Sequence, residues 1–337
     1  MNSTKKILGI VFAVLFVLTA VPALIFFNFD RRAFTAETYQ TAFANNDFYG
    51  KLPAVMAEAM HSSTVDTSKL PIVMQDMSQD AWEAFFRTLL PPETLKAMGD
   101  EMLNSIFAYF NMQTNSAQLS LVALKASMGS DSGPQAVYKL LETRPECTLA
   151  QMAQMASSLL SNGEIQFCKP PEKLYPILTP VIQKQMQFAA LAIPDQLTLI
   201  SATLDNDPRV KLQTARIAMR FSPILPLFFL LLMTIFTVNS FKSWLNWWGI
   251  PFCITGILAS IMSLSGAPIF SVVLQRILEN RMPAFFPSIL LGYASELASA
   301  MLQALLRPVL WQGLIIALIG LVMAISSYFI KKNSTTI

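Results

Sequence analysis

Apolar residues concentrate in four long stretches, which a long polar region and several shorter polar segments separate. The first stretch, residues 7–27, carries no charge and would measure about 31 Å as a helix at 1.5 Å per residue. Two more stretches lie within residues 221–270, and the fourth is residues 309–330. Because a bilayer core is about 30 Å thick, this pattern predicts four transmembrane helices.

The two middle stretches, residues 221–270, are predicted to form a transmembrane hairpin. Its short polar turn holds one cation beside three indoles: Lys242, Trp244, Trp247 and Trp248. Indole combines an apolar body with one N–H donor, so tryptophan is enriched where a membrane meets water. We therefore expect the turn to lie at one membrane face.

Residues 1–27 are predicted to remain on the protein as an N-terminal anchor. A cleaved signal peptide is the alternative, because Val21-Pro22-Ala23 could serve as a small-residue cleavage site. The apolar run continues to Phe27 without giving way to a polar region, which favours the anchor.

The polar region, residues 28–220, is long enough for one domain with its own core and is predicted to be mostly helical. One helix is expected to begin at Ser78, since apolar residues then recur at helical spacing. Residues 118–122 and 196–200 instead alternate polar and apolar positions. These two stretches are expected to pair as a small β ribbon, which leaves the fold class mainly α.

Two cysteines, Cys147 and Cys168, bracket one predicted helix that Thr148 can cap and Gly163 can end. A disulfide between them would stabilise the domain by about 3 kcal/mol through loop entropy. Two separate buried thiols are the alternative. Their spacing does not match a metal site, and the third cysteine, Cys253, lies inside an apolar stretch.

Residues 271–308 are predicted to form amphipathic, membrane-proximal helices. Only Arg307-Pro308 separates their apolar part from residues 309–330, which is too short for a comfortable reversal between two spans. We expect a helix that continues into the last span, with a kink at Pro308, before a short tail at residues 331–337. A fifth span at residues 287–306 is the alternative.

Charge sets the expected orientation. Four spans place both termini and the hairpin turn on one side, which holds only cations: Lys5, Lys6, Lys242, Lys331 and Lys332. The positive-inside rule makes this side cytoplasmic, so residues 28–220 would lie outside a bacterial inner membrane, where a disulfide persists. Arginines on the outer side count against this orientation: Arg31, Arg32, Arg216 and Arg220. Long domains cross regardless of charge, and we expect Arg216 and Arg220 to approach lipid headgroups at the membrane interface.

The composition agrees with a membrane protein. The chain is 53% hydrophobic and 13% charged, against roughly 25% charged residues in soluble domains. A net charge of +3, without a basic run longer than two residues, argues against a nucleic-acid partner. The single histidine, His61, excludes a His-rich zinc site.

No catalytic or cofactor-binding motif occurs in the sequence. It lacks a G-x-S-x-G elbow, an HExxH helix, a phosphate-binding glycine loop and an EF-hand loop. Met60 next to His61 could bind Cu(I), but methionines at helical spacing more often fill helical cores. The predicted spans hold no Asp, Glu, Lys, Arg or His, which argues against an ion path. We therefore expect no cofactor, no metal and no enzymatic activity.

Several segments carry a resemblance: FNFDRRAFTAETY after the first span, LLPPETL, the Cys147/Cys168 pair with KPPE, and RFSPILPLFFLLL leading to FKSWLNWWGIP. In this order they resemble a family of uncharacterised bacterial polytopic membrane proteins. The resemblance implies a large extracytoplasmic domain between the first and second spans. It implies no activity for any residue.

The expected function is that of a non-enzymatic envelope protein whose outer domain binds a protein partner, a lipid or an apolar ligand. Charge-free spans, an outer domain rich in methionine and phenylalanine, and amphipathic segments at the membrane surface favour this hypothesis. A subunit of a membrane transport complex is one alternative, and an extracytoplasmic metal-binding or hydrolytic protein is another.

Overall fold

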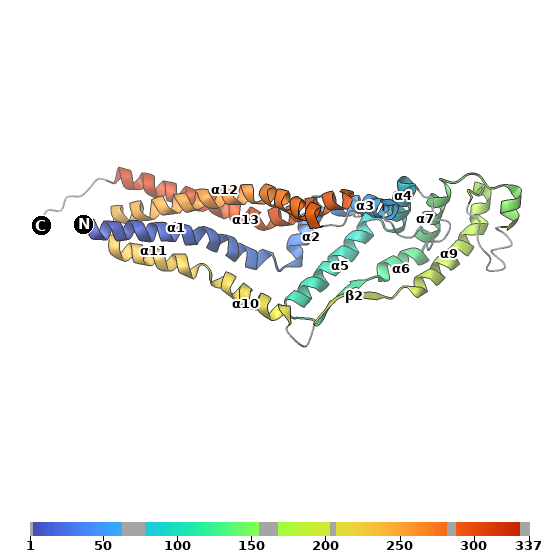
Figure 1. The fold of residues 1–337 in the computed structure, drawn as a ribbon, viewed down its shortest axis with the longest axis horizontal. Coiled ribbons are helices and arrows are strands. Elements are labelled where there is room, and N and C mark those ends of the chain that lie inside the picture. The colour runs from blue at the N-terminus through green and yellow to red at the C-terminus, as the bar shows by residue number, and fades with distance from the viewer. Residues whose placement is uncertain (1–2, 63–77, 155–167, 203–206, 282–287, 331–337) are drawn as a thin grey trace. The chain divides into compact units, whose positions relative to one another are not determined.

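The computed structural model describes residues 3–62, 78–154, 168–202, 207–281 and 288–330. The fold is mainly α with one two-stranded antiparallel sheet, as predicted (Figure 1). The chain divides into two compact units. The bundle unit comprises Met1–Ala42, Thr203–Leu274 and Ala298–Ile337, and the ribbon unit comprises Phe43–Ala202 and Gln275–Leu297.

The bundle unit is built on long apolar helices. Its elements are α1 (Ser3–Arg32), α10 (Pro208–Phe221), α11 (Ile224–Thr237) and most of α12 (Phe241–Arg281) and α13 (Ser288–Phe329). Within the described residues, four segments are long and apolar enough to cross a membrane: Thr4–Arg32, Pro208–Thr237, Phe241–Ile277 and Gly292–Phe329. These four segments contain the four predicted apolar stretches.

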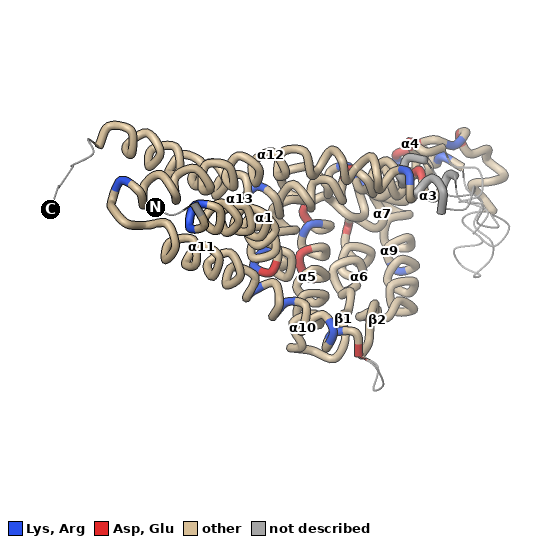
Figure 2. The backbone as a smooth tube through the Cα atoms, turned by 60° about the vertical axis from the view of Figure 1, so that its left-hand side comes forward, with Lys and Arg blue, Asp and Glu red and all other residues tan. Residues whose placement is uncertain are grey.

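The surface of these helices is apolar. Large side chains from all four segments are more than half exposed, among them Leu18 (64%), Ile235 (66%), Leu264 (64%) and Leu318 (61%). Water would penalise each such side chain, whereas hydrocarbon would not. Figure 2 also shows that charged residues are absent along most of α1 and α11. This inverted pattern is what a lipid environment selects.

The predicted hairpin turn lies beside two other helix ends. Lys242 Nζ donates a hydrogen bond to the backbone oxygen of Ile330, just after α13, at 2.7 Å. Gly9, near the start of α1, packs against Thr237 and Trp247. The start of α1, the α11–α12 turn and the end of α13 therefore meet at one end of the bundle (Figure 1).

Helices α12 and α13 pack through backbone contacts at glycines. A Cβ atom on Gly256 would lie 2.3 Å from the nitrogen of Ala317 and 2.5 Å from the oxygen of Gly313. A Cβ atom on Gly320 would lie 2.3 Å from the nitrogen of Cys253. In hydrocarbon, apolar burial contributes little to helix association, so small residues that allow close approach are favoured.

Both long helices continue through prolines. Helix α12 passes through Pro268 and beyond residue 270, the predicted limit of the hairpin, and ends at Arg281. Its packing on α13 extends there, since a Cβ on Gly266 would lie 2.6 Å from Leu306 Cδ1. One missing N–H does not end a helix that its neighbour supports. Helix α13 continues through Pro308, as expected.

The ribbon unit contains shorter elements. These are the end of α2 (Ala36–Asn45), α3 (Phe48–Ser62), α4 (Gln79–Leu89), α5 (Pro92–Phe110), β1 (Ser116–Ser120), α6 (Val122–Gly129), α7 (Ser132–Leu141), a 3-10 turn (Glu172–Leu174), α9 (Tyr175–Ala192) and β2 (Gln196–Ser201). The predicted polar domain, residues 28–220, is larger than this unit, because the end of α1 and all of α10 belong to the bundle unit.

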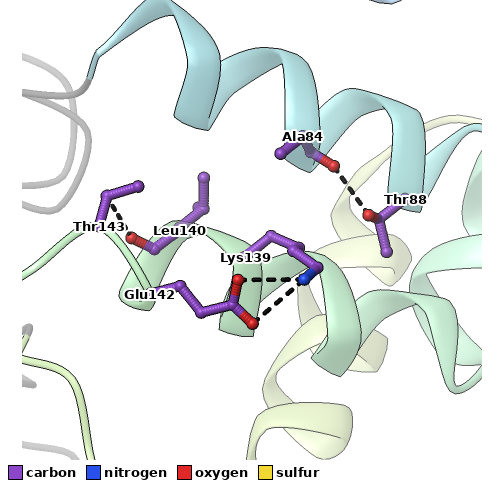
Figure 3. Close-up of polar contacts among 6 residues, drawn as sticks. All are labelled: Ala84, Thr88, Lys139, Leu140, Glu142 and Thr143. Atoms are coloured by element: carbon purple, nitrogen blue, oxygen red, sulfur yellow. Dashed lines mark hydrogen bonds and ion pairs between the residues drawn. The ribbon is translucent and has the colours of Figure 1, made fainter.

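Helices α4 and α7 pack together in the core of the ribbon unit. The oxygen of Ser78 caps α4 by accepting the N–H of Ala81 at 3.3 Å, at the predicted start of this helix. Trp82, Phe85 and Leu89 of α4 are buried, as are Tyr138 and Leu141 of α7. At the end of α7, Lys139 forms a half-exposed ion pair with Glu142 at 3.0 Å (Figure 3).

The first part of α13 is anchored to α3 within the ribbon unit. The hydroxyl of Tyr293 donates to the backbone oxygen of Phe48 at 2.8 Å, and the two rings stack at 5.2 Å. Lys51 forms an ion pair with Glu296 at 2.5 Å.

The predicted β ribbon is confirmed. Strands β1 and β2 pair antiparallel with Leu119 opposite Leu197, and a bulge lies at Ala117/Gln118. The first strand lies two residues earlier than predicted, because Val122 begins α6. The backbone N–H of Leu121 still donates to the oxygen of Asp195 at 2.8 Å, so the pairing ends where the helix begins.

Cys147 and Cys168 form the predicted disulfide. The backbone supports it, since the N–H of Cys147 donates to the oxygen of Lys169 at 3.0 Å. Thr148 caps the following helix by accepting the N–H of Gln151 at 3.3 Å. The predicted end of this helix at Gly163 lies outside the described residues.

Replacing Gly256 with alanine should separate α12 from α13, because the new Cβ meets backbone atoms that cannot move aside. We expect Gly256→Ala to destabilise the bundle by about 1–3 kcal/mol, the usual range for overpacking. Thermal unfolding of the purified chain in detergent would measure this loss.

Gly292→Ala is the matched control, because no described atom lies within 4 Å of the Cβ it would add. Alanine is the better helix former by about 1 kcal/mol, so this variant should be at least as stable as the parent. Equal melting temperatures for both variants would contradict the close packing at Gly256.

Candidate functional site

Asp30 is a buried carboxylate in the last turn of α1. Its side chain is 3% exposed. Two guanidinium groups of α10 contact it, with Arg216 Nε 3.3 Å from Oδ1 and Arg220 Nε 3.3 Å from Oδ2. The structure therefore brings the two predicted interface arginines together on one carboxylate that the sequence analysis did not single out.

The sequence of α10 explains this geometry. Arg216 and Arg220 are four residues apart, so they lie on one helix face. That face packs against α1, where the guanidinium of Arg216 also lies over the ring of Phe34, 4.4 Å from its centroid. Such a cation–π contact adds to the ion pair and holds the guanidinium plane in place.

An apolar cluster lies next to these charged groups in the sequence. Ala33 and Phe34, just after α1, pack with Leu305 of α13 and with Leu212 and Met219 of α10. The Asp30 side chain itself is buried. A buried ion pair in such surroundings requires both partners, because a single buried charge is far more costly than the pair.

A second polar contact joins α1 to α13. Asn28 Nδ2 donates to Gln312 Oε1 at 2.7 Å, and Gln312 Nε2 donates back to Asn28 Oδ1 at 3.1 Å. Asn28 is 4% exposed. These reciprocal hydrogen bonds pair the amide groups of both side chains inside the bundle. In apolar surroundings, they hold the two helices in one specific register.

The start of α10 carries a further ion pair. The carboxylate of Asp207 accepts the backbone N–H of Arg209 at 2.9 Å and its Nε at 2.8 Å. These hydrogen bonds hold the pKa of Asp207 below its usual range. Arg209 is 6% exposed, so its guanidinium group pairs with the carboxylate at the start of α10 and does not face solvent.

We use the name arginine collar for Asp30 together with the arginines at the same level of the bundle unit. Arg31 and Arg32, in the last turn of α1, are exposed. Arg307 is exposed on α13, between Leu305, which packs on Ala33, and Gln312, which pairs with Asn28. The collar thus combines five arginines with one carboxylate: Arg31, Arg32, Arg216, Arg220, Arg307 and Asp30. Its chemistry suits an anion.

The predicted interface residues at the other end of the bundle are also in contact. Trp248 Nε1 donates to Thr234 Oγ1 at 3.0 Å, and the rings of Trp244 and Trp248 lie 5.2 Å apart. Trp247 packs in the cluster that contains Phe16 and Met233. These contacts fix the turn, and none of them forms a reactive site.

The ribbon unit has an open cavity of about 480 Å³ between α6 and α9. Its walls are mainly apolar, and Lys125, Gln187 and Asp195 supply the polar groups. Lys125 and Asp195 form an ion pair with each other. The full lining is Val122, Lys125, Ala126, Gly129, Gln187, Ala190, Leu191 and Asp195.

Large apolar side chains are exposed at this cavity and elsewhere on α9. Leu191, which lines the cavity, is 74% exposed, and Phe188 of the same helix is 73% exposed. On β2, which follows α9 in the chain, Leu197 is 49% exposed and Leu199 is 40% exposed. No sequence pattern indicated this surface, because α9 has apolar residues on several faces.

The metal hypothesis has little geometric support where it can be tested. Among the described residues, no three histidine, cysteine or acidic side chains come together as a metal site would require. The side chain of His61, which the copper hypothesis needs, lies outside the described residues.

Comparison with known proteins returned no match: no protein-family model, no curated protein and no solved structure is similar to this chain.

Replacing Asp30 with asparagine should destabilise the bundle. The change leaves Arg216 in its buried position without the carboxylate, and breaking a buried pair typically costs about 3–5 kcal/mol. Arg220 is 64% exposed, so water can solvate its guanidinium group when the carboxylate is lost. We therefore expect a loss of stability at the lower end of that range. Thermal unfolding in detergent would measure the loss.

Two further variants test the cause. Asp30→Asn combined with Arg216→Gln should recover part of the stability, because neither charge is then buried alone. Glu37→Gln removes an exposed acid of α2 and should change nothing. If Asp30→Asn unfolds at the same temperature as Glu37→Gln, the ion pair does not hold the bundle together.

Proposed function

We propose that this chain is a multi-pass protein of a bacterial inner membrane, with both termini in the cytoplasm and the ribbon unit outside. Four apolar helical segments support the membrane location. The cations near Lys242 and at the start of α1 support the orientation through the positive-inside rule. The disulfide between Cys147 and Cys168 supports it too, because disulfides persist in oxidising compartments.

The proposed function is non-enzymatic binding of a lipid-like amphiphile by the ribbon unit. One observation carries it: an open cavity of about 480 Å³ between α6 and α9, beside exposed apolar residues of the same unit. Small-molecule sites typically measure about 300–1,000 Å³ and have mostly apolar walls. Contiguous apolar patches that are exposed to water on a folded domain commonly mark sites of ligand or partner binding.

The polar groups of the cavity suit the head of an amphiphile. Val122, Ala190 and Leu191 offer walls for a hydrocarbon chain, whereas Lys125 and Asp195 offer both signs of charge. Gln187 adds an amide that already donates to the backbone oxygen of Gly129 at 3.3 Å. A ligand with an apolar chain and a small polar end would match both parts of the lining.

Leu191→Asp should abolish this binding, because it places a charge on the apolar wall. Burying a leucine contributes about 1.5–3 kcal/mol, so its loss alone should weaken binding about tenfold or more. We would add a photoactivatable fatty acid to membrane vesicles that contain the full chain and map the cross-linked peptides. The parent should carry adducts on α6 and α9.

Leu149→Asp is the matched control, since Leu149 is 83% exposed in the same unit but does not line the cavity. Adducts on the apolar segments of the bundle unit give the internal reference for probe in the membrane. Equal labelling of α9 in both variants, or labelling of the bundle unit alone, would contradict an amphiphile site in the ribbon unit.

A further inference from the structure

Arg220 stands at the end of an exposed apolar stripe in the bundle unit. Arg220 near the end of α10 is followed in α11 by Ile224, Leu227 and Leu231, at intervals of four, three and four residues. Ser222 and Pro223 between the two helices keep right-handed helical backbone angles, so the spacing of one helix face continues across the turn. The Arg220 side chain is 64% exposed. The three apolar residues are 59%, 59% and 57% exposed, respectively.

The length of this stripe matches one leaflet of a bilayer. Eleven residues separate Arg220 from Leu231, which is about 16 Å along a helix, close to half of a core about 30 Å thick. Thr237, beside the Lys242 turn, is about 26 Å from Arg220 by the same rise. With the turn at one membrane face, Arg220 therefore reaches the headgroup region of the opposite leaflet.

Asp30 holds the guanidinium groups of two arginines in positions that suit a second anion. The carboxylate binds Nε of Arg216 and Nε of Arg220, so both guanidinium groups are held by a side chain that is itself 3% exposed. Two cations share one anion, which leaves a net positive charge. The planar guanidinium group matches the oxygen geometry of a phosphate better than an ammonium group does.

The rest of the collar adds cations at the same level. Arg31 and Arg32 end α1, and Arg307 lies on α13 near the level of Ala33. Arg31 is held over the ring of Phe27, 4.4 Å from its centroid. Glu37 on α2 is the next acid after Asp30 in the sequence, and the collar itself has five arginines for one carboxylate, so its net charge is positive.

We propose that Arg220, together with Arg216, binds the phosphate of an anionic phospholipid whose acyl chain lies along Ile224, Leu227 and Leu231. This inference rests on the proposed membrane insertion of the bundle unit and is independent of the ligand of the ribbon unit. A zwitterionic lipid carries its own ammonium group, which repels the collar. The site should therefore prefer anionic lipids.

The experiment compares lipids bound to the full chain. The purified protein is mixed in detergent with equal amounts of phosphatidylglycerol and phosphatidylcholine, and native mass spectrometry counts each bound lipid. We expect the parent to prefer phosphatidylglycerol and Arg220→Gln to weaken that preference about fivefold, which corresponds to about 1 kcal/mol. Arg220→Lys keeps the charge and should fall between the two.

Lys211→Gln is the matched control, because it removes one exposed cation from the same helix farther from the apolar stripe. It should keep the preference of the parent. Loss of preference in Lys211→Gln equal to that in Arg220→Gln would show a general charge effect and overturn the proposal. An unchanged preference in Arg220→Gln would overturn it as well.

A separate arm distinguishes the lipid from free phosphate. Inorganic phosphate is titrated into the parent, and its effect on the melting temperature is compared with that of phosphatidylglycerol. Stabilisation by the lipid alone is the expected result. Equal stabilisation by inorganic phosphate would overturn the lipid assignment. Folding of each variant is checked by its melting temperature without lipid, where Arg220→Lys must match the parent.

Discussion

The burial of one carboxylate at the end of α1 constrains the whole bundle unit. Asp30 lies in the last turn of α1, after a long stretch of this helix with exposed apolar side chains, and its own side chain is almost fully buried. A charge in that position must be neutralised by a partner in direct contact, since neither hydrocarbon nor packed side chains can solvate it. Arg216 and Arg220 provide the partner, and they fix α10 against α1 at one height.

Packing alone would not fix that height. The lipid-facing side chains of the four apolar segments gain nothing by exchanging lipid for one another, so contacts of defined geometry must select the arrangement. The ion pair aligns α1 with α10, and the amide pair of Asn28 with Gln312 aligns α1 with α13. Gly256 and Gly320 determine how closely α12 approaches α13. The ion pair and the amide pair join helices far apart in the sequence, whereas the glycines join two consecutive helices.

Features that depend on local pattern were predictable from the sequence. The spacing of residues indicated the apolar stretches, the start of α4 at Ser78, the two alternating segments of the ribbon, and the helix between Cys147 and Cys168.

The role of Asp30 could not be predicted, because its partners lie 186 and 190 residues away and neither α1 nor α10 alone indicates the pairing. The cavity was missed for the same reason, since α6 and α9 come together only in the fold. The continuation of α12 through Pro268 could not be predicted either, because it depends on the packed neighbour α13 and not on local pattern.

The proposed topology places the ribbon unit outside the cell membrane and the Lys242 turn in the cytoplasm. The direct test is thiol labelling of intact cells with a membrane-impermeant reagent, in a background where Cys253 is replaced by alanine. Gln135→Cys probes the ribbon unit and Asn239→Cys probes the turn, and both positions are exposed. We expect labelling at 135 but not at 239, with Cys147 and Cys168 reacting only after reduction. Labelling at 239 but not at 135 would place the ribbon unit in the cytoplasm and contradict the account.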